Sequence, residues 1–529
     1  MNATMQAISR RNLVGAAGAL AVTAGTLAPL GASADEVTLD QAGQMREYDI
    51  PGRISTSELA GSLATSEPLA ADDEASCDVL VIGAGTAGIP CAISAAQAGA
   101  SVIVLQKEER AIAQGATLAY IDPEQTDELG IAHLVRTMQE LFDYRSKIAL
   151  NASWARNCTE AVDWLLGLLT DAGVAPEAIA TVPGAVFEYP EGNAAVACYM
   201  FPKLGGINGM IQTLAESYAD LIDVRYSTPA VQLIREGDAV VGAYARREDG
   251  SVLRVNAAKG VVLATGDYQN NDAMVEKYIP DAASFPRKQF GKTGDGHLMG
   301  MLAGAKMQST CHCKMIHQSN ALDVFQDFKS TPFLAVNMNG ERFTAEDENF
   351  CYRNNMVLEQ PDKKWMCVLD SKDPRELFGE RSGLDSLQGK TPDEGGVYTA
   401  DTIEGLAEAM GIEPAALVAT VDRYNELCTS GAGDLDFGKA TKYMVAIDTP
   451  PYYGLHKEYW LTAITSGLEV DGDFRVLDNE LNPIDGLYAI GNCSGPFYGC
   501  PDYPMDVPAV STSRCVTGGY VLGKAVATR

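Results

Sequence analysis

Three glycines between two apolar runs carry the clearest chemical signal in the chain. Gly83, Gly85 and Gly88 follow the GxGxxG spacing, directly after the apolar run at residues 78–82. Glycine at these positions permits a tight turn, lets the backbone approach a pyrophosphate and lets a helix pack closely on a strand. The helix N-terminus then faces the phosphate charge. The spacing predicts a dinucleotide site, with a glycine-rich turn without ligand as the alternative.

A strand, a helix and a second strand must position this turn. Residues 78–82 (DVLVI) are rich in β-branched residues, as is typical of a buried parallel strand. Residues 89–98 show a helical pattern that ends at Gly99, and residues 101–105 (SVIVL) predict the second strand. Gln106 stands where an acidic residue ordinarily holds the ribose hydroxyls. Its amide can still hydrogen-bond a diol, without the charge.

Two later strands return the chain to the same site. Residues 261–268 (VVLATGDY) and 486–492 (GLYAIGN) each predict a buried strand that ends in a glycine turn. A chain that reaches one nucleotide in three places is unusual for NAD-linked enzymes. The sequence resembles the FAD-dependent fumarate reductase and succinate dehydrogenase superfamily over almost all residues after the N-terminal segment. The resembling segments are 83–88, 205–206 (GG), 228–231 (TPAV), 264–266 (ATG), 293–296 (TGDG), 339–343 (NGERF) and 486–492.

This resemblance implies an α/β fold in which a Rossmann-like FAD-binding domain carries an inserted α+β substrate-capping domain. It also implies non-covalent FAD, bound extended, with adenine near Val231 and ribitol near Asn492. A helix predicted over 507–526, with Pro508 in its first turn, would point its N-terminus at the flavin and stabilise negative charge there. The expected FAD-binding residues are Gly83, Gly85, Ala87, Gly88, Gln106, Lys107, Gly115, Thr117, Val231, Ala264, Thr265, Gly266, Asp295, Gly491, Asn492 and Val510.

The N-terminus resembles a twin-arginine (Tat) export signal. Arg10 and Arg11 precede a weakly apolar run at 13–30, and residues 32–34 (ASA) form a cleavage site. A membrane anchor is the alternative, which the glycines in the run disfavour. We therefore expect export to the periplasm or cell surface. The predicted organisation is signal 1–34, acidic leader 35–76, FAD-binding domain 77–284, capping domain 285–450 and FAD-binding domain again at 451–529.

Charge and cysteine content limit the partners. The 529 residues contain 40 Lys plus Arg and 70 Asp plus Glu, for a net charge of -30. Such a surface repels phosphate backbones and anionic lipid, so we expect no nucleic acid and membrane contact only through a donor protein. The 12 cysteines form no CxxC or CxxCH motif, which argues against a thioredoxin-type site or c-type haem. The Cys311-His312-Cys313 segment looks metal-like but lacks further ligands, so no metal is expected.

The substrate-binding cations of fumarate reductases are missing. The His-Thr-x-Gly-Gly segment of that family aligns with 463–467 (AITSG), and its Asn-Arg-Leu-Gly-Gly segment aligns with 501–505 (PDYPM). Phe350 stands in place of the acid-donating arginine. Losing these groups removes bidentate carboxylate recognition, so fumarate and succinate are disfavoured as substrates. Aromatic residues occupy or flank the positions instead: Phe350, Tyr352, Phe497, Tyr498 and Tyr503.

Three side chains are candidates for the catalytic proton donor. Tyr503 with Pro504 matches the start of a Tyr-Pro-Gly-Pro-Gly segment in ketosteroid dehydrogenases, and residues 492–504 are also similar to reductases of activated double bonds from anaerobic gut bacteria. Arg353 follows Phe350 by one helical turn, and His317 lies within one residue of a substrate-facing histidine of the family. The alternative to a catalytic role is a packed core tyrosine for Tyr503 and an ordinary histidine for His317. Arg342 is expected to be structural or part of a proton path.

The resemblance favours an exported flavoprotein reductase of anaerobic respiration. It would transfer hydride from FAD N5 to an activated C=C bond of a small enone, enoate or aryl-acrylate. Electrons would come from a separate cytochrome or flavoprotein, because the chain has no haem motif. The alternatives are a ketosteroid 1,2-dehydrogenase, which runs the reverse reaction, and a flavin-binding electron carrier without a substrate. An NAD-linked dehydrogenase is the weakest alternative.

Overall fold

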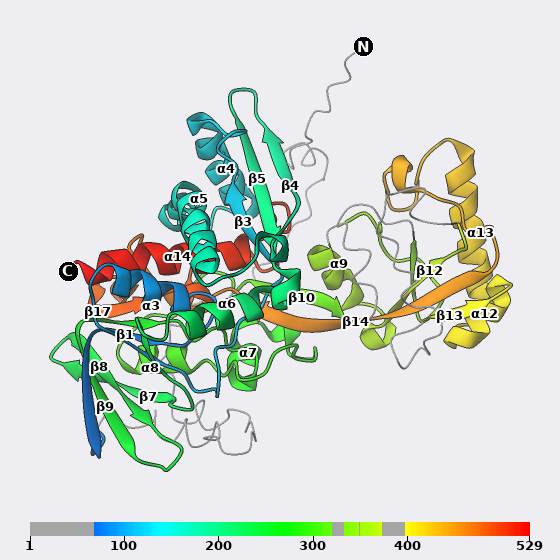
Figure 1. Cartoon of the computed structure of the whole chain (residues 1–529). Helices are drawn as coiled ribbons and strands as arrows, with labels where there is room; N and C mark the ends of the chain where they lie inside the picture. The colour runs from blue at the N-terminus through cyan, green and yellow to red at the C-terminus, as the bar shows by residue number, and fades with distance from the viewer. Residues whose placement is uncertain (1–67, 320–332, 349, 373–396) are drawn as a thin grey trace, which may run out of the picture. The chain divides into compact units, whose positions relative to one another are not determined.

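Eight strands form the sheet that carries the glycine-rich turn (Figure 1). Its central strand, β1 (Asp73–Ile82), pairs in parallel with β2 on one side and β9 on the other. The order is β16-β17-β9-β1-β2-β6, and the antiparallel pair β7-β8 joins through β9. The other strands are β2 (Val102–Leu105), β6 (Asp223–Arg225), β7 (Ala230–Glu236), β8 (Ala239–Arg246), β9 (Val252–Leu263), β16 (Arg475–Leu477) and β17 (Pro483–Ala489).

The computed structural model describes residues 68–319, 333–348, 350–372 and 397–529, all within one unit, Glu36–Arg529. The predicted export signal and residues 35–67 of the predicted leader lie outside these residues, and the last four leader residues, 73–76, belong to β1. The parallel pairing of β1, β2 and β9 confirms the predicted Rossmann-like α/β class.

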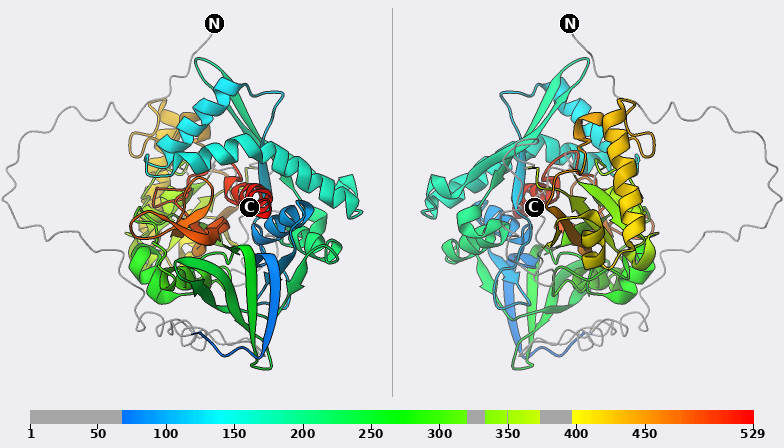
Figure 2. Two further views of the ribbon diagram at one scale, coloured as in Figure 1. Left: turned by 90° about the vertical axis from the view of Figure 1, so that its left-hand side faces the viewer. Right: turned by 90° about the vertical axis from the view of Figure 1, so that its right-hand side faces the viewer.

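Two helices pack face to face along the parallel sheet (Figure 2). Helix α3 (Gly88–Gln97) follows the glycine turn, and α14 (Val510–Ala527) ends the chain. A Cβ on Gly519 would lie 2.4 Å from the carbonyl oxygen of Ala87, and a Cβ on Gly523 would lie 2.5 Å from that of Cys91. The glycines of α14 therefore permit a helix contact that any larger side chain would push apart.

The helix predicted from residue 507 begins later than the sequence pattern indicates. Pro508 precedes α14 instead of lying in its first turn. Ala509 is the N-cap residue and has a left-handed backbone with φ of 54°. Residues 506–509 form a bend and a turn that includes Pro508, and helical backbone begins only after the left-handed Ala509.

A second sheet of five strands, the cap sheet, is built from the later half of the chain. Its order is β10-β14-β12-β11, with β13 paired to β14. Leu334, Val336, Met366 and Val368 alternate along β11 and β12 and form a core with α12 and α13. The elements are β10 (Lys314–Ser319), β11 (Leu334–Asn337), α9 (Phe350–Val357), β12 (Trp365–Leu369), β13 (Tyr398–Ala400), α12 (Ile403–Met410), α13 (Pro414–Ser430) and β14 (Tyr452–Ile464).

This mixed α/β unit confirms the predicted strand at 365–369 and the predicted helices at 403–410 and 414–428. Strand β14 carries the cap sheet to Ile464, past the expected end of the capping domain at 450. The domain boundaries themselves stay a prediction. A third, three-stranded sheet, β3 (Thr117–Ile121), β5 (Asn193–Met200) and β4 (Ala180–Glu188), lies with α4 (Glu128–Leu141) and α5 (Ile148–Asp171).

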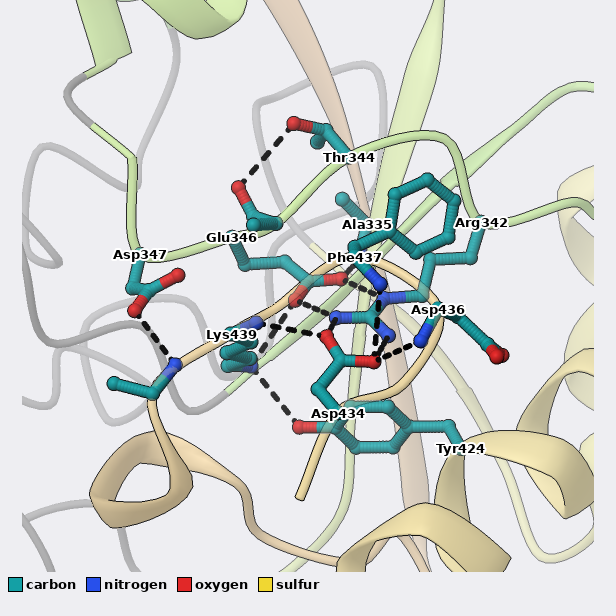
Figure 3. Close-up of polar contacts among 12 residues, drawn as sticks. Ala335, Arg342, Thr344, Glu346, Asp347, Tyr424, Asp434, Asp436, Phe437 and Lys439 are labelled. Atoms are coloured by element: carbon teal, nitrogen blue, oxygen red, sulfur yellow. Dashed lines mark hydrogen bonds and ion pairs between the residues drawn. The ribbon is translucent and has the colours of Figure 1, made fainter. Parts of the chain in front are cut away.

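A buried ionic network ties β11 to the loop after α13 (Figure 3). Arg342 donates to both carboxylate oxygens of Glu346, at 2.9 and 2.8 Å, and to both of Asp434, at 3.0 and 2.8 Å. Lys439 lies 3.3 Å from Glu346 and donates to the Phe333 carbonyl and the Tyr424 hydroxyl, each at 3.0 Å. Two cations thus meet two carboxylates with nearly every hydrogen bond made. These contacts favour the structural role expected for Arg342.

Replacing Lys439 with Met should weaken the cap sheet strongly. Without Lys439 the network holds two carboxylates and one cation, Arg342, and the uncompensated buried negative charge costs about 3 kcal/mol or more. Hydrogen exchange of the β11 amides should show this loss as faster local opening. Arg423→Met, at an exposed pair with Asp436, is the control and should change opening by less than about 1 kcal/mol. Equal effects of the two variants would contradict the account.

The network also predicts acid sensitivity of the cap sheet. Burial opposes ionisation of Asp434, but the hydrogen bonds from Arg342 outweigh it and lower the pKa of Asp434 from 3.8 to about 2. A lowered folded-state pKa contributes stability that is complete above the ordinary pKa and is lost as the pH falls toward 2. An acid titration followed by tryptophan fluorescence should therefore show a steeper loss between pH 4 and 2 in the wild type than in Asp434→Asn. Identical titrations would refute this.

Candidate functional site

A cavity opens where the central strands of the parallel sheet end. Its wall is formed by the residues that follow β1 (83–87), β2 (106–108), β9 (264–266) and β17 (491–492). Ligands of open α/β sheets bind outside the carboxyl ends of the strands, so the cavity has the position expected of a nucleotide site.

The three glycines of the turn have different steric surroundings. Gly83 has φ of +110°, and a Cβ there would lie 2.4 Å from the carbonyl oxygen of Ala264. A Cβ on Gly88 would lie 1.8 Å from the carbonyl oxygen of Gly83. At Gly85 a Cβ would meet only the Ile112 carbonyl oxygen, at 3.2 Å. Gly83 and Gly88 are therefore required for packing, and Gly85 leaves the backbone open to the cavity.

Gln106 braces the turn through both ends of its amide. Its Oε1 accepts a hydrogen bond from the Ala84 backbone N–H at 3.2 Å, and its Nε2 donates to the Arg110 carbonyl at 3.0 Å. An acidic residue could accept the first bond but could not donate the second. The sequence pattern missed this bracing role, and the expected contact with the ribose stays a prediction.

Two lysines give the cavity positive charge. Lys107 donates to Asp295 and Thr293, each at 2.7 Å, which joins the end of β2 to the first turn of α8 (Asp295–Leu302). Lys292 lines the cavity next to Gly266, whose Cβ would lie 3.1 Å from the lysine Nζ. Desolvation lowers the pKa of Lys292, and the nearby Asp267 carboxylate opposes the shift. Sequence reasoning missed Lys292, although it immediately precedes the TGDG segment.

Unpartnered polar atoms in the cavity wall fit a polar ligand. The hydroxyl of Thr265 and the Oε1 of Gln114 are buried and have no hydrogen-bond partner. Both residues line the cavity. Buried polar atoms of this kind are rare unless a ligand or water satisfies them. With the open backbone at Gly85 and the two lysines, they suit a dinucleotide with a charged pyrophosphate and polar ribityl and ribose groups.

Most of the expected FAD-binding residues meet at this cavity, although their individual roles stay a prediction. The residues that line it are Gly83, Gly85, Ala87, Gln106, Lys107, Ala264, Thr265, Gly266, Asp295, Gly491 and Asn492. Lining residues not expected from the sequence include Glu108, Gln114, Pro229, Phe290, Lys292, Met299 and Cys515. Met299 and Cys515 belong to α8 and α14, and the others lie within a few residues of expected positions in the chain.

Five expected residues lie behind the cavity wall. Gly88 packs on the turn, as described above. A Cβ on Gly115 would lie 2.3 Å from the Thr512 side chain, and the Thr117 carbonyl accepts a hydrogen bond from the same threonine. Val231 is fully buried beside the lining residue Ala230, and Val510 begins α14.

Tyr503 is held at the start of α14. The side chain is 2% exposed, and its hydroxyl oxygen accepts a hydrogen bond from the Ser511 backbone N–H at 3.2 Å. Burial raises the pKa of the phenol, so it stays protonated at neutral pH. Lys314 anchors the same loop: its backbone pairs with Pro501 and Tyr503, and its Nζ lies 2.8 Å from Asp502. The structure thus places a neutral phenol at a helix N-terminus, which favours a negative charge.

Arg353 contacts a different part of the protein. Its guanidinium lies 5.6 Å from the ring centres of both Phe333 and Trp365. Asn355, two residues on, donates to Asp502 at 2.8 Å. Because successive helical residues are rotated by about 100°, Arg353 and Asn355 lie on nearly opposite faces of α9. Arg353 therefore lies on the face of α9 opposite to Asn355, against the rings of Phe333 and Trp365. His317 belongs to β10, where its backbone pairs with Trp460.

The metal-like segment is occupied by protein contacts. Arg145 donates to the Cys311 sulfur at 3.2 Å. His312 hydrogen-bonds the Tyr268 hydroxyl at 2.5 Å through Nδ1 and the Gln308 carbonyl at 3.2 Å through Nε2. Burial lowers the pKa of His312 to about 4, so it is neutral. Among the residues that the structure describes, no group of three or more His, Cys, Asp or Glu side chains is arranged to hold a metal.

The fold and the cavity define an FAD-binding protein. Residues 78–500 match the family model described as the FAD binding domain, and the chain belongs to this family. The residues that line the cavity fit the cofactor, and the protein is an FAD-dependent oxidoreductase. No helix in the described part of the chain is long and apolar enough to span a membrane.

Curated relatives cover most of the chain. It is 27% identical to the vinyl phenol reductase of Lactiplantibacillus plantarum over 474 residues, which is 81% of this chain and 92% of that protein. It is 28% identical to the urocanate reductase of Eggerthella lenta, over 79% of this chain and 70% of that protein.

Two solved structures share the fold. The open conformation of a flavocytochrome c3 fumarate reductase has a TM-score of 0.68 at 24% identity, covering 86% of this chain and 79% of that one. The 3-ketosteroid delta1-dehydrogenase from Sterolibacterium denitrificans also has a TM-score of 0.68, at 19% identity, with 86% and 99% coverage.

Gly85→Leu should weaken FAD binding strongly without unfolding the protein. The backbone of Gly85 does not need a left-handed conformation, and a Cβ there would meet only the Ile112 carbonyl oxygen, at 3.2 Å, which a shift of a few tenths of an ångström relieves. The longer side chain of leucine would fill the space of the pyrophosphate. We expect FAD affinity to fall by about 100-fold or more, as for the loss of about 3 kcal/mol of binding. FAD content after gel filtration and circular dichroism would measure both effects.

Gly167→Leu provides the matched control, because a Cβ on Gly167 has no atom within 4 Å. Its FAD content should equal that of the wild type. Normal FAD content in Gly85→Leu would show that the cofactor does not approach this turn.

Proposed function

We propose that the protein is a reductase that uses FAD to reduce an activated C=C bond of a small molecule. The observation that carries this proposal is the phenol of Tyr503, held neutral at the N-terminus of α14, the helix that also contributes Cys515 to the FAD cavity. The names of the relatives support it, since vinyl phenol and urocanate both contain a conjugated C=C bond. The expected substrates are enones, enoates and aryl-acrylates.

The FAD, when bound, supplies hydride for one carbon of the double bond. The neighbouring carbon then needs a proton, and we assign its donor as the buried Tyr503 hydroxyl, which its raised pKa keeps protonated at neutral pH. The Ser511 N–H and the positive end of α14 would stabilise the phenolate that remains after proton transfer. The aromatic rings of Phe142, Phe497 and Tyr498 pack around this loop and exclude water from it.

Arg353 and His317 are the alternative proton donors. The face of α9 that carries Arg353 turns away from Asp502, which supports Tyr503 over Arg353. The aromatic loop also supports a planar conjugated acceptor over a dicarboxylate.

The direction of the reaction has one competing proposal. A ketosteroid 1,2-dehydrogenase would use the same tyrosine to act on a saturated ketone, and Tyr503 with Pro504 suits this alternative as well. A flavin-binding electron carrier without a substrate would need no proton donor. Reoxidation of the reduced protein by an unsaturated acceptor supports the reductase, and reduction of the oxidised protein by a saturated ketosteroid supports the dehydrogenase.

Export and the electron donor complete the proposal. The twin-arginine pair supports Tat-dependent export to the periplasm or cell surface. A separate cytochrome or flavoprotein would supply electrons, and a cationic donor surface suits the net charge of -30. Such an encounter would slow as salt is added.

Replacing Tyr503 with Phe should leave FAD bound and slow acceptor reduction by about 100-fold or more, as for the loss of a general acid. The measurement is viologen-coupled anaerobic turnover with a panel of cinnamates, urocanate, enones and fumarate. Wild-type protein must oxidise the viologen with at least one unsaturated acceptor.

Tyr520→Phe is the matched control, since Tyr520 lies further along α14 and bonds Glu160. It should react at the wild-type rate. Unchanged turnover in Tyr503→Phe would remove Tyr503 from the mechanism, and no turnover of any acceptor by the wild type would refute the reductase.

A further inference from the structure

Arg514 is a buried cation beside the FAD cavity. The residue is 6% exposed and lies in the second turn of α14. Its Nη1 donates to the carbonyl oxygen of Gly491 at 3.0 Å, and its Nη2 donates to Oδ1 of Asn492 at 2.7 Å. Both partners line the cavity. The arginine therefore fixes the loop after β17 from behind the cavity wall.

The charge of Arg514 is not neutralised by a carboxylate among the described residues. Its Nε is buried without a hydrogen-bond partner. The guanidinium lies 5.3 Å from the ring centre of Phe497 and 5.4 Å from that of Tyr498, and such cation–π contacts offset only part of the cost of burial. A buried unpaired charge is costly, so a nearby negative group should stabilise it.

The other cations of the cavity have acidic neighbours in the protein. Lys107 forms an ion pair with Asp295 at 2.7 Å. Desolvation lowers the pKa of Lys292, but the negative charge of Asp267 opposes this shift and so stabilises the charged form of this lysine. Arg514 differs from both, and its counter-charge has to come from what the cavity holds.

The order of the sheet indicates which part of FAD lies near Arg514. The pyrophosphate of a dinucleotide lies on the turn after β1, and the adenosine ribose lies at the end of the next strand, β2. The remaining half of the cofactor must extend the other way, over the ends of β9 and β17. Gly491 and Asn492 follow β17, so the redox-active half is the part that approaches the loop held by Arg514.

We propose that Arg514 is a positioning residue of the FAD site that orients the Asn492 amide and raises the midpoint potential of the bound cofactor. Because Oδ1 of Asn492 is taken by Arg514, the amide Nδ2 is left as a donor for the cofactor. Reduction makes the ring system more negative, and a buried positive charge binds the more negative form more tightly. The inference rests on FAD binding and is independent of which acceptor is reduced.

Two variants separate the charge from the hydrogen bonds. Arg514→Gln removes the charge and keeps an amide donor, whereas Arg514→Lys keeps the charge and loses the bidentate fork. The readouts are the midpoint potential by anaerobic spectroelectrochemistry in excess FAD and the dissociation constant of FAD. For Arg514→Gln we expect the ratio of reduced to oxidised FAD affinity to fall by about tenfold, which is about 30 mV for a two-electron couple. In Arg514→Lys the ratio of reduced to oxidised FAD affinity should stay within about twofold of the wild-type ratio. Both oxidised and reduced FAD should bind more weakly to this variant.

Lys524→Gln is the control on the same helix, where the side chain is half-exposed and pairs with Glu160. Its potential should be that of the wild type. An unchanged potential in Arg514→Gln would overturn the proposal. The proposal would also fail if the midpoint potential of Arg514→Lys fell as far as that of Arg514→Gln. It would fail as well if neither variant bound FAD, because Arg514 would then serve only the folding of the loop. These outcomes do not depend on turnover and so are distinct from a failure of the proposed reductase activity.

Discussion

The close approach of backbone to backbone at the ends of the parallel strands is the constraint on which the site depends. The turn after β1 has no space for a side chain at Gly83, where a Cβ would lie 2.4 Å from the Ala264 carbonyl oxygen. The same crowding recurs in α14, where a Cβ on Gly519 would lie 2.4 Å from the Ala87 carbonyl oxygen. These contacts bring the ends of β1, β9 and β17 and the start of α14 around one cavity. The residues that follow β1, β9 and β17 and line the cavity are placed by this packing.

Charge is the second constraint, and it separates structure from function. In the cap sheet, Arg342 and Lys439 are matched by Glu346 and Asp434, so the network needs nothing from outside. At the cavity, Arg514 has no such match within the described chain. A protein can retain an unpaired buried cation when a ligand supplies the opposite charge. This contrast is the reason that we assign a structural role to Arg342 and Lys439 and a role in the cofactor site to Arg514.

The sequence predicted those parts of the fold that depend on local pattern. The β1–turn–α3–β2 unit and helix α12 follow from apolar residues at regular spacing that end at a glycine, and strand β12 follows from a short apolar run. The expected FAD-binding residues were predicted from glycine spacing and family resemblance, and 11 of these 16 residues line the cavity. What the pattern could not supply depends on tertiary contacts: the bracing bonds of Gln106, the position of Lys292, and the opposite faces of α9 that carry Arg353 and Asn355. The start of α14 was misplaced because a left-handed residue, Ala509, decides it.

The most direct test of the account is a single turnover without any donor or dye. Holoprotein reduced under anaerobic conditions, freed of reductant and mixed with an unsaturated acceptor should return to the oxidised FAD spectrum. One saturated product should form for each FAD, as identified by mass spectrometry. Reoxidation with that stoichiometry would establish a reductase of activated C=C bonds. Reduced FAD that persists with every acceptor, while a saturated ketosteroid reduces the oxidised protein, would contradict the account and assign the reverse reaction.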